Sequence, residues 1–351
     1  MLWNGNSRRV TFLLGAGATR GAFRHALLNR KRIRAPLNGD FFTVAETLVR
    51  AQSENRSLAM RLARIRKVFR EEFPTRGEWP IPMEDAFNLL YVSKDFPEIY
   101  APARGRHRQP GVRREIEDFL RLTFEMLGAI EAGAGRDNLY SSLVACLEPR
   151  DTIVTLNYDT LLDSALVRAG WDAHDGYGLG GNRQKVKWRV AGVNANPRLR
   201  AVKLLKLHGS TNWYVRGNYG KLTRVFDSRP SKVLGPRSNE VQGYIRQVVP
   251  PVYGKFFAHS HWANLWTAAH ESILESDVIV VIGCSLIDSD FHLRGMLSHA
   301  ISQRKKEGRS FRAVALVDKR KIRNKWKHLF RGSTGTFSVF KTFESFAEAN
   351  L

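Results

Sequence analysis

Three short stretches of the chain place residues capable of chemistry at the ends of apolar runs. TFLLGAGAT at 11–19 runs from a strand pattern into a glycine-rich turn, the kind of turn that lets backbone N–H groups approach a phosphate. IVTLNYDTLLD at 153–163 ends its apolar run at Asn157, and LLKLHGSTNW at 204–213 ends its run at His208. Because strand ends of an open α/β sheet converge on one crevice, the sequence predicts that all three meet at a ligand site.

Asn157 and His208 each have two interpretations at the level of local sequence. An imidazole can act as a general base at neutral pH, and an Asn side chain at a strand end can hydrogen-bond a ribose or a water. Alternatively, Asn157 or Asp159 caps the helix predicted from TLLDSAL, and His208 bonds to backbone at a strand–turn junction. The hypothesis of a shared site depends on these residues coming together in the fold.

Two further strand ends carry polar residues. In GCSLIDSD at 283–290, Gly283 permits close approach and Ser285 can donate to a phosphate or ribose, while Asp288 and Asp290 fit as caps of the next helix. Asp318 ends the following apolar run, where either an adenosine contact or a turn suits it. Near the first glycine turn, Arg24 of the AFR sequence at 22–24 adds a cation.

Strand and helix patterns alternate at both ends of the chain, with a helical block between them. The apolar runs predict buried strands over 10–14, 151–156, 202–209, 278–283 and 311–318. Helical periodicity fills 42–135, and further helices are expected over 139–148, 160–170, 261–276 and 290–308. Residues 18–40 are expected to be basic and loop-rich, residues 171–200 to be mostly loop, and residues 213–250 to form short hairpins.

This alternation predicts an α/β protein with a doubly wound parallel sheet that carries an inserted helical module. The expected division is an α/β domain from 1–41 and 139–351, with the helical module spanning 42–138.

Composition favours a folded protein that contacts anions. The 351 residues are 43% hydrophobic, and 56 Lys and Arg against 33 Asp and Glu give a net charge of +23. Nucleic acid is a candidate partner, or the basic residues form a solvated face; the segments concerned are 30–34, 61–70, 104–114 and 319–332.

The cysteine content limits the metal sites and the compartment. The two cysteines, Cys146 and Cys284, form no CxxC pair, which excludes a four-cysteine zinc module. Two thiols without a signal peptide predict a reducing cytoplasm, and the apolar run at 278–283 is too short to span a bilayer. We therefore expect a cytoplasmic protein with no membrane partner.

The order GAGA, NYD, KLHG and GCSL resembles the sirtuin-type (silent information regulator) NAD-binding fold. The flanking APLNGDFF at 35–42, PPVYGKFF at 250–257 and SLIDSD at 285–290 look like bacterial sirtuin-like proteins of anti-phage defence. The resemblance implies that Asn157 and His208 are catalytic and that Asp159 supports the nicotinamide ribose. It also implies a set of NAD-binding residues: Gly15, Ala16, Gly17, Thr19, Phe23, Arg24, Gly283, Ser285 and Asp318.

Two departures from deacylating sirtuins direct the functional hypothesis. The loop GIPDFR of those enzymes is compressed here to RGAFR at 20–24, and the zinc cysteines are absent. The resemblance therefore implies an NAD+ hydrolase that releases nicotinamide and ADP-ribose without a metal. An NAD-dependent protein deacylase and a basic nucleic-acid-binding or assembly subunit remain alternatives. The resemblance also implies a homo-oligomer, or a partner such as a ring-shaped ATPase translocase or an Argonaute-like protein.

Overall fold

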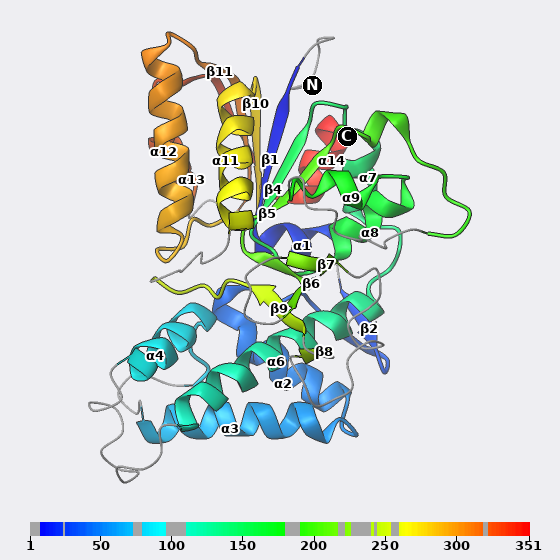
Figure 1. Ribbon diagram of the computed structural model, residues 1–351, viewed down its shortest axis with the longest axis vertical. Coiled ribbons are helices and arrows are strands. Elements are labelled where there is room, and N and C mark those ends of the chain that lie inside the picture. Colours follow the sequence, from blue (N-terminus) through cyan, green and yellow to red (C-terminus); the bar gives the residue numbers. More distant parts are fainter. Residues whose placement is uncertain are drawn as a thin grey trace.

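A six-stranded parallel sheet forms the centre of the protein, in the order β12-β11-β10-β1-β4-β5 (Figure 1). The computed structural model describes residues 8–23, 25–72, 79–95, 110–179, 190–216, 222–225, 240–241, 244–253, 260–318 and 322–351. The strands are β1 Val10–Leu14, β4 Thr152–Thr155, β5 Lys203–Lys206, β10 Val278–Ile282, β11 Phe311–Val317 and β12 Thr334–Phe340. The predicted α/β class with a parallel sheet is confirmed.

The central strands are continuous apolar runs because both faces of the sheet are covered. Every residue of β1 and of β10 is buried, and the two strands pair in parallel from Val10 opposite Val278 to Leu14 opposite Ile282. On its other side β1 pairs with β4, which in turn pairs with β5. The chain thus builds one half of the sheet outward from β1, then returns to build the other half.

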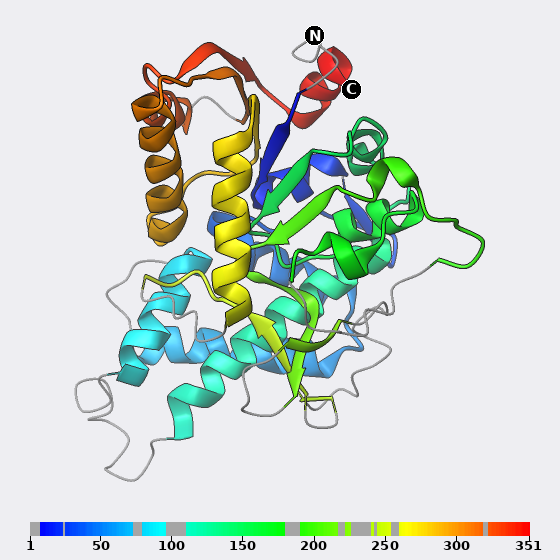
Figure 2. The same ribbon diagram turned by 45° about the horizontal axis from the view of Figure 1, so that its top comes forward.

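Helices lie on both faces of the sheet, as Figures 1 and 2 show from two directions. Helices α11 and α12 pack together on one side, and α1, α7, α8 and α14 lie on the other. The bounds are α1 Ala16–Ala22, α7 Leu139–Ala145, α8 Leu161–Arg168, α9 Ala173–Gly176, α11 Ser260–Glu275, α12 Phe291–Lys306, α13 Arg323–Leu329 and α14 Phe343–Asn350. The predicted helices over 139–148, 160–170, 261–276 and 290–308 correspond to α7, α8, α11 and α12.

The helical block lies beyond the carboxyl ends of the strands (Figure 1). It consists of α2 Phe41–Ala51, α3 Arg56–Glu72, α4 Met83–Asp95 and α6 Pro110–Gly133. Its core is aromatic: Phe87 of α4 stacks on Phe119 of α6 with ring centroids 3.9 Å apart. The predicted helical character of 42–135 is confirmed where the chain is described. The assignment of 42–138 as a separate module remains a prediction.

Residues 18–40, expected to be basic and loop-rich, also contain four short regular elements that the sequence analysis did not predict. Helix α1 starts inside the glycine turn and continues to Ala22, and a hairpin of β2 Ala26–Leu28 and β3 Lys31–Ile33 follows it. A 3-10 helix, η1 Asn38–Asp40, leads into α2. The hairpin forms because Ala26 and Ile33 are paired and buried, which anchors an otherwise basic segment to the core.

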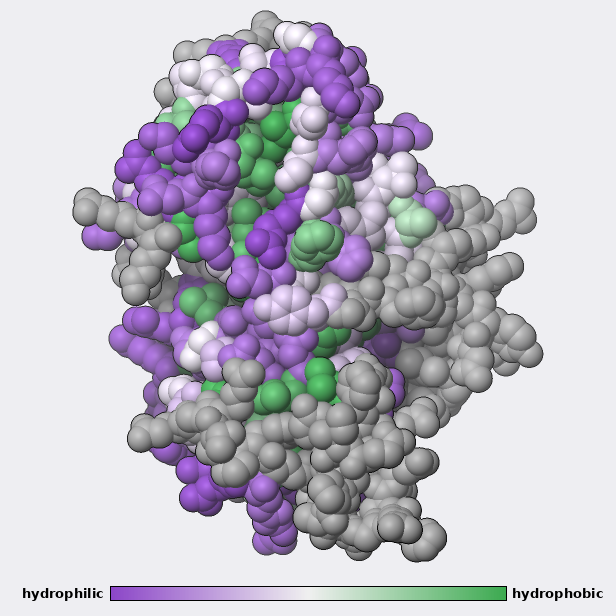
Figure 3. Space-filling view, turned by 90° about the vertical axis from the view of Figure 1, so that its left-hand side faces the viewer, coloured by the Kyte–Doolittle hydropathy of each residue, from purple (hydrophilic) through white to green (hydrophobic). Residues whose placement is uncertain are grey.

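A second, four-stranded antiparallel sheet has the order β7-β6-β9-β8. Its strands are β6 Gly209–Arg216, β7 Leu222–Val225, β8 Glu240–Val241 and β9 Tyr244–Val248, as expected from the hairpin signals over 213–250. Another short 3-10 helix, η3 Pro197–Leu199, precedes β5. Within the described ranges we find no helix with the length and apolar character needed to span a membrane. In Figure 3, hydrophilic side chains cover much of the described surface, and hydrophobic ones show in patches between them.

Candidate active site

A cavity of about 570 Å³ opens at the carboxyl ends of the strands, between the sheet and the helical block. A volume of this size falls within the range of about 300–1,000 Å³ that is typical of ligand pockets. The sheet side contributes the ends of β1, β4, β5, β10 and β11, and the helical block contributes Met83, Thr123 and Leu127. The cavity also sits where strand order reverses about β1, the point at which open α/β sheets bind ligands.

Most residues predicted for the site line this cavity. The predicted residues that line it are Gly15, Ala16, Gly17, Thr19, Asn157, Asp159, His208, Gly283, Ser285 and Asp318. Phe23 does not: its side chain is buried in the hydrophobic core at the end of α1. Arg24 lies outside the described residues.

The glycine turn is locked against the loop after β10, backbone to backbone. Gly15 N–H donates to Ile282 O at 3.1 Å, and Gly17 N–H donates to Gly283 O at 3.0 Å. A Cβ on Gly17 would come within 2.7 Å of Gly283 Cα, and Gly283 itself has a φ of +58°. Glycine is therefore needed at position 283 for packing, because it lets the two loops approach closely.

Three of the four amides of the turn are used in bonds to backbone carbonyls of described residues. Gly15, Gly17 and Ala18 all use their N–H groups on backbone carbonyls. Ala16, at the first position of α1, is exposed and makes no such bond to another described residue. The first N–H groups of a helix have no partner within it, and they attract anions.

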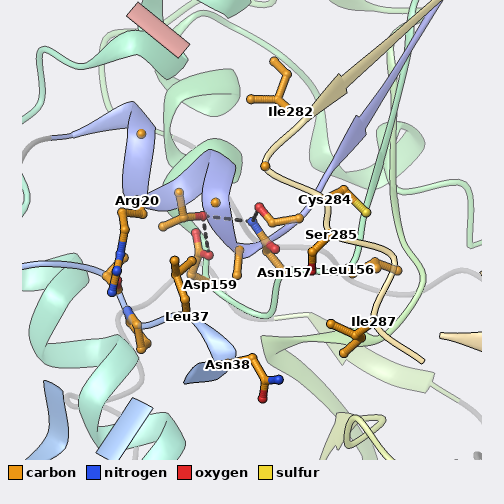
Figure 4. Close-up of a pocket in the computed structure, with 18 of the residues that line it drawn as sticks. Arg20, Leu37, Asn38, Leu156, Asn157, Asp159, Ile282, Cys284, Ser285 and Ile287 are labelled. Carbon is orange, nitrogen blue, oxygen red and sulfur yellow. Dashed lines mark hydrogen bonds between the residues drawn. The ribbon is translucent and has the colours of Figure 1, made fainter. Parts of the chain in front are cut away.

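Asn157 is held in one orientation by both hydrogens of its carboxamide nitrogen. Nδ2 donates to Gly15 O and to Thr19 Oγ1, each at 2.9 Å (Figure 4). Because both donors are used on protein, the carboxamide oxygen is the atom that can meet a ligand. The alternative in which Asn157 caps α8 is wrong; Asp159 Oδ1 instead accepts from Leu161 N–H at 3.2 Å.

The hydroxyl of Thr19 is the centre of a buried polar network. It donates to Asp159 Oδ2 at 2.8 Å, lies 2.9 Å from Tyr140 Oη and accepts the bond from Asn157. A hydroxyl has one hydrogen and two lone pairs, so Tyr140 must be the donor and the hydroxyl is fully used. Burial raises the pKa of Tyr140 far above its ordinary value, which keeps its proton in place.

Charged groups beneath the site complete the network. Burial raises the pKa of Asp159, while the nearby Lys206 ammonium lowers it. Lys206 Nζ donates to the Asp159 carbonyl at 2.5 Å and to Asp163 Oδ2 at 3.0 Å, and both side chains of this ion pair are buried. From the helical block, Glu131 accepts a 2.7 Å bond from Thr160 N–H, and burial raises its pKa to about 7.

His208 faces Asp290, an acidic residue whose position in the sequence also fits a helix cap. Asp290 is the N-cap residue of α12, yet its side chain makes no capping hydrogen bond. Its Oδ1 lies 3.8 Å from His208 Nε2, and both side chains are about 95% buried. Asp290 also lines the cavity, which makes it a site residue that sequence analysis missed.

The remaining residues of the β10 and β11 loops differ in accessibility. Cys284 lines the cavity but is buried, and burial raises the pKa of its thiol to about 12, so it is not a thiolate nucleophile at neutral pH. Ser285 and Asp318 line the cavity on the same loops. Among the described residues, no group of three or more His, Cys, Asp or Glu side chains is placed to hold a metal ion.

Some of the basic residues stabilise the fold through ion pairs. Within segment 61–70, Arg61 and Arg64 both contact Asp118 of α6, and Arg61 also pairs with Glu125 at 3.1 Å. These ion pairs tie α3 to α6 inside the helical block. Segment 104–114 lies mostly outside the described residues, as do residues 319–321 of the last basic segment.

One family model and two solved structures are similar to the chain. The family model of the SIR2-like domain matches residues 151–330. A structure of Sir2Tm bound to a propionylated peptide aligns over 97% of this chain and 91% of its own, with 13% identity and a TM-score of 0.34. A Sir2 variant with a deacetylated p53 peptide and 3′-O-acetyl ADP-ribose aligns over the same shares, with 12% identity and a TM-score of 0.38. No curated protein matches the chain significantly.

Proposed function

The chain belongs to the SIR2-like domain family, and from this premise we propose that it hydrolyses NAD+ to nicotinamide and ADP-ribose. The observation that carries the proposal is the meeting of the glycine turn, Asn157 and His208 in one cavity. These residues are far apart in the sequence, and each comes from the end of a different strand.

Binding of the dinucleotide follows from the donors that the cavity offers. Ala16 N–H at the start of α1 meets the diphosphate, and Ser285 donates to a phosphate or ribose oxygen. Asp318, at the end of β11, accepts from adenosine ribose hydroxyls. Gly15, Gly17 and Gly283 allow the backbone to come close. Thr19 acts through Asn157, because its hydroxyl is used entirely by protein groups.

The reaction breaks the bond between the ribose C1′ and the nicotinamide nitrogen. The bonding electron pair leaves with nicotinamide, and the positive charge that develops on the ribose is stabilised by fixed dipoles such as the Asn157 carboxamide oxygen. Water then bonds to C1′ and gives its proton to His208. The Asp290 carboxylate, 3.8 Å away, stabilises the imidazolium that results.

The test follows nicotinamide and ADP-ribose by chromatography after incubation of the purified full chain with NAD+. We expect His208→Ala to lower turnover by about 100- to 10,000-fold, the usual contribution of a general base. Asn157→Ala should be similarly impaired. His174→Ala, which removes an exposed imidazole outside the cavity, is the matched control. Undiminished turnover by His208→Ala would contradict the assignment.

We further propose that this activity acts in the bacterial cytoplasm in anti-phage defence, by depletion of NAD+ within a homo-oligomer or partner complex. The resemblance of the segments at 35–42 and 285–290 to defence proteins supports the idea. Cells that express the wild type should lose NAD+ after phage infection, whereas cells that express His208→Ala should not. Light scattering on the purified chain would measure its oligomeric state.

A further inference from the structure

A second cavity, of about 730 Å³, adjoins the first and has basic walls. Four residues line both cavities: Arg20, Gly21, Thr342 and Phe343. The other residues that line the second cavity are His25, Arg32, Arg34 and Glu344. Gly21 and Phe343 form the partition, since a Cβ on Gly21 would meet Phe343 Cβ at 3.1 Å.

Two arginines that line this cavity are not paired to carboxylates of the part of the chain that the structure describes. Arg32 lies on β3 and Arg34 follows it, and the residue between them, Ile33, is buried. Both arginines line the cavity and are two positions apart in the chain, so their Cα atoms lie within about 7 Å of each other. Both are exposed, and neither makes a salt bridge to another described residue.

The other charged groups in the cavity do not cancel this pair. Arg20 is already matched: it donates to both carboxylate oxygens of Asp40, at 2.5 and 2.8 Å, and to Ala35 O. Glu344 contributes one negative charge, against the two positive charges of Arg32 and Arg34. Two exposed guanidinium groups that line one cavity suit a phosphate, which arginine binds through paired hydrogen bonds.

The second cavity lies beside the first, against helix α1 and the start of α14. Thr342 and Phe343 follow β12, which pairs with β11, and Asp318 directly follows β11 in the first cavity. Phe343 also faces Tyr140, with ring centroids 6.1 Å apart, and Tyr140 bonds to the hydroxyl of Thr19. A ligand in the basic cavity would therefore lie close to a nucleotide bound in the first cavity.

We propose that the basic cavity is a second anion site, which holds a phosphate group next to a nucleotide bound in the first cavity. The phosphate has two sources with the same chemistry: an additional phosphate on the dinucleotide itself, as in NADP+, or a separate phosphate ligand. The choice of NADP+ as a probe depends on the proposed function, whereas the anion site itself does not.

The test is calorimetric titration of the full chain with NAD+, NADP+ and inorganic phosphate. The variant is Arg32→Ala/Arg34→Ala, and its matched control is Arg56→Ala/Arg331→Ala. The control removes the same charge from two exposed arginines that line neither cavity. We expect the first variant to weaken binding of NADP+ or of phosphate at least tenfold and to change NAD+ binding less than twofold. The control should match the wild type in every titration.

The titrations also separate the sources. Tighter binding of NADP+ than of NAD+, lost in the variant, assigns the phosphate to the dinucleotide. Phosphate binding that persists when NAD+ is saturating, and is lost in the variant, assigns it to a separate ligand. Equal affinities in the wild type and the variant would overturn the inference. The inference would also be overturned if only the binding of a DNA oligonucleotide, and not that of NADP+ or phosphate, were lost in the Arg32→Ala/Arg34→Ala variant. Phosphate binding through these arginines without any NAD+ binding would instead contradict the proposed function and leave the anion site standing.

Discussion

The hydroxyl of Thr19 accepts a 2.9 Å hydrogen bond from the carboxamide of Asn157, so helix α1 holds the residue that follows β4. The same hydroxyl donates to Asp159, two residues further along the loop. One side chain thus fixes both polar residues of the NYD sequence relative to the glycine turn. The proposed catalytic Asn is therefore positioned by a residue that does not itself need to touch the substrate.

Replacement of Thr19 by Val should separate this positioning role from binding. Val keeps the shape but leaves buried polar partners unsatisfied, which should lower the free energy of unfolding by about 1–3 kcal/mol. NAD+ turnover should fall by about tenfold or more, while Thr19→Ser should retain most of it. Thr47→Val, which alters an exposed hydroxyl on α2, is the control. A Thr19→Val enzyme with wild-type kcat would contradict the role.

Asp290→Asn tests the acidic neighbour of His208. Loss of the negative charge at 3.8 Å removes stabilisation of the imidazolium formed during turnover, and each 1.4 kcal/mol lost corresponds to about a tenfold lower rate. We expect kcat to fall at least tenfold, and the acidic limb of the rate–pH profile to move to lower pH. Asp288→Asn, an exposed carboxylate on the same loop, should leave both unchanged. A lower rate with an unmoved pH profile would indicate a merely structural role.

Gly17→Ala should disturb the contact between the two loops that form the floor of the cavity. The added Cβ would come within 2.7 Å of Gly283 Cα, and neither backbone can move without breaking the bond from Gly17 N–H. We expect a loss of about 1–3 kcal/mol of stability, typical of overpacking, together with weaker NAD+ binding. Gly295→Ala on α12 meets nothing within 4 Å and should instead stabilise the protein by about 0.5–1 kcal/mol. Thermal and urea unfolding would measure both.

Glu131 should make stability fall as the pH rises. Its pKa increases from 4.5 to about 7 on folding, chiefly through burial, so the folded state binds the proton more tightly. The cost of ionising this partly buried group appears as the pH passes from the unfolded to the folded pKa, and reaches about 3 kcal/mol above pH 7. Glu131→Gln keeps an acceptor for Thr160 N–H and removes this cost.

The variant should therefore gain stability relative to the wild type between pH 5 and pH 8. Urea unfolding at the two pH values measures the change, and Glu54→Gln at an exposed position serves as the control. A constant difference between wild type and Glu131→Gln across that range would show that Glu131 does not titrate with folding.

The strands of the sheet centre could be predicted from sequence because they are unbroken apolar runs, but β12 could not. Its sequence TGTFSVF mixes Gly, Ser and Thr with apolar residues, and all its residues are at least partly exposed at the edge of the sheet. Such a strand has neither the continuous run of a buried strand nor a clear alternation. The short helix α1 was missed for a related reason, since two glycines stand in it.

Site residues that follow a strand could be predicted from the sequence. Site residues that reach the site only through tertiary contacts could not. Asn157 and His208 follow apolar runs, so their convergence follows from the fold class. Asp290 stands at a helix start, where Asp is common, and its proximity to His208 links positions 82 residues apart. Glu131 belongs to an amphipathic helix whose pattern does not reveal which polar residue meets the loop after β4.

The contact between Gly17 and Gly283 determines how late in synthesis and folding the cavity can form. The floor of the cavity joins β1 to β10, which lies about 270 positions later in the chain and pairs with it in parallel. The far wall includes Phe343, near the end of the chain. Pairing over such a distance is slow and late in folding. A growing chain therefore has no complete cavity until β10 and Phe343 have been made and have folded onto β1, and the proposed NAD+ hydrolysis would begin only then.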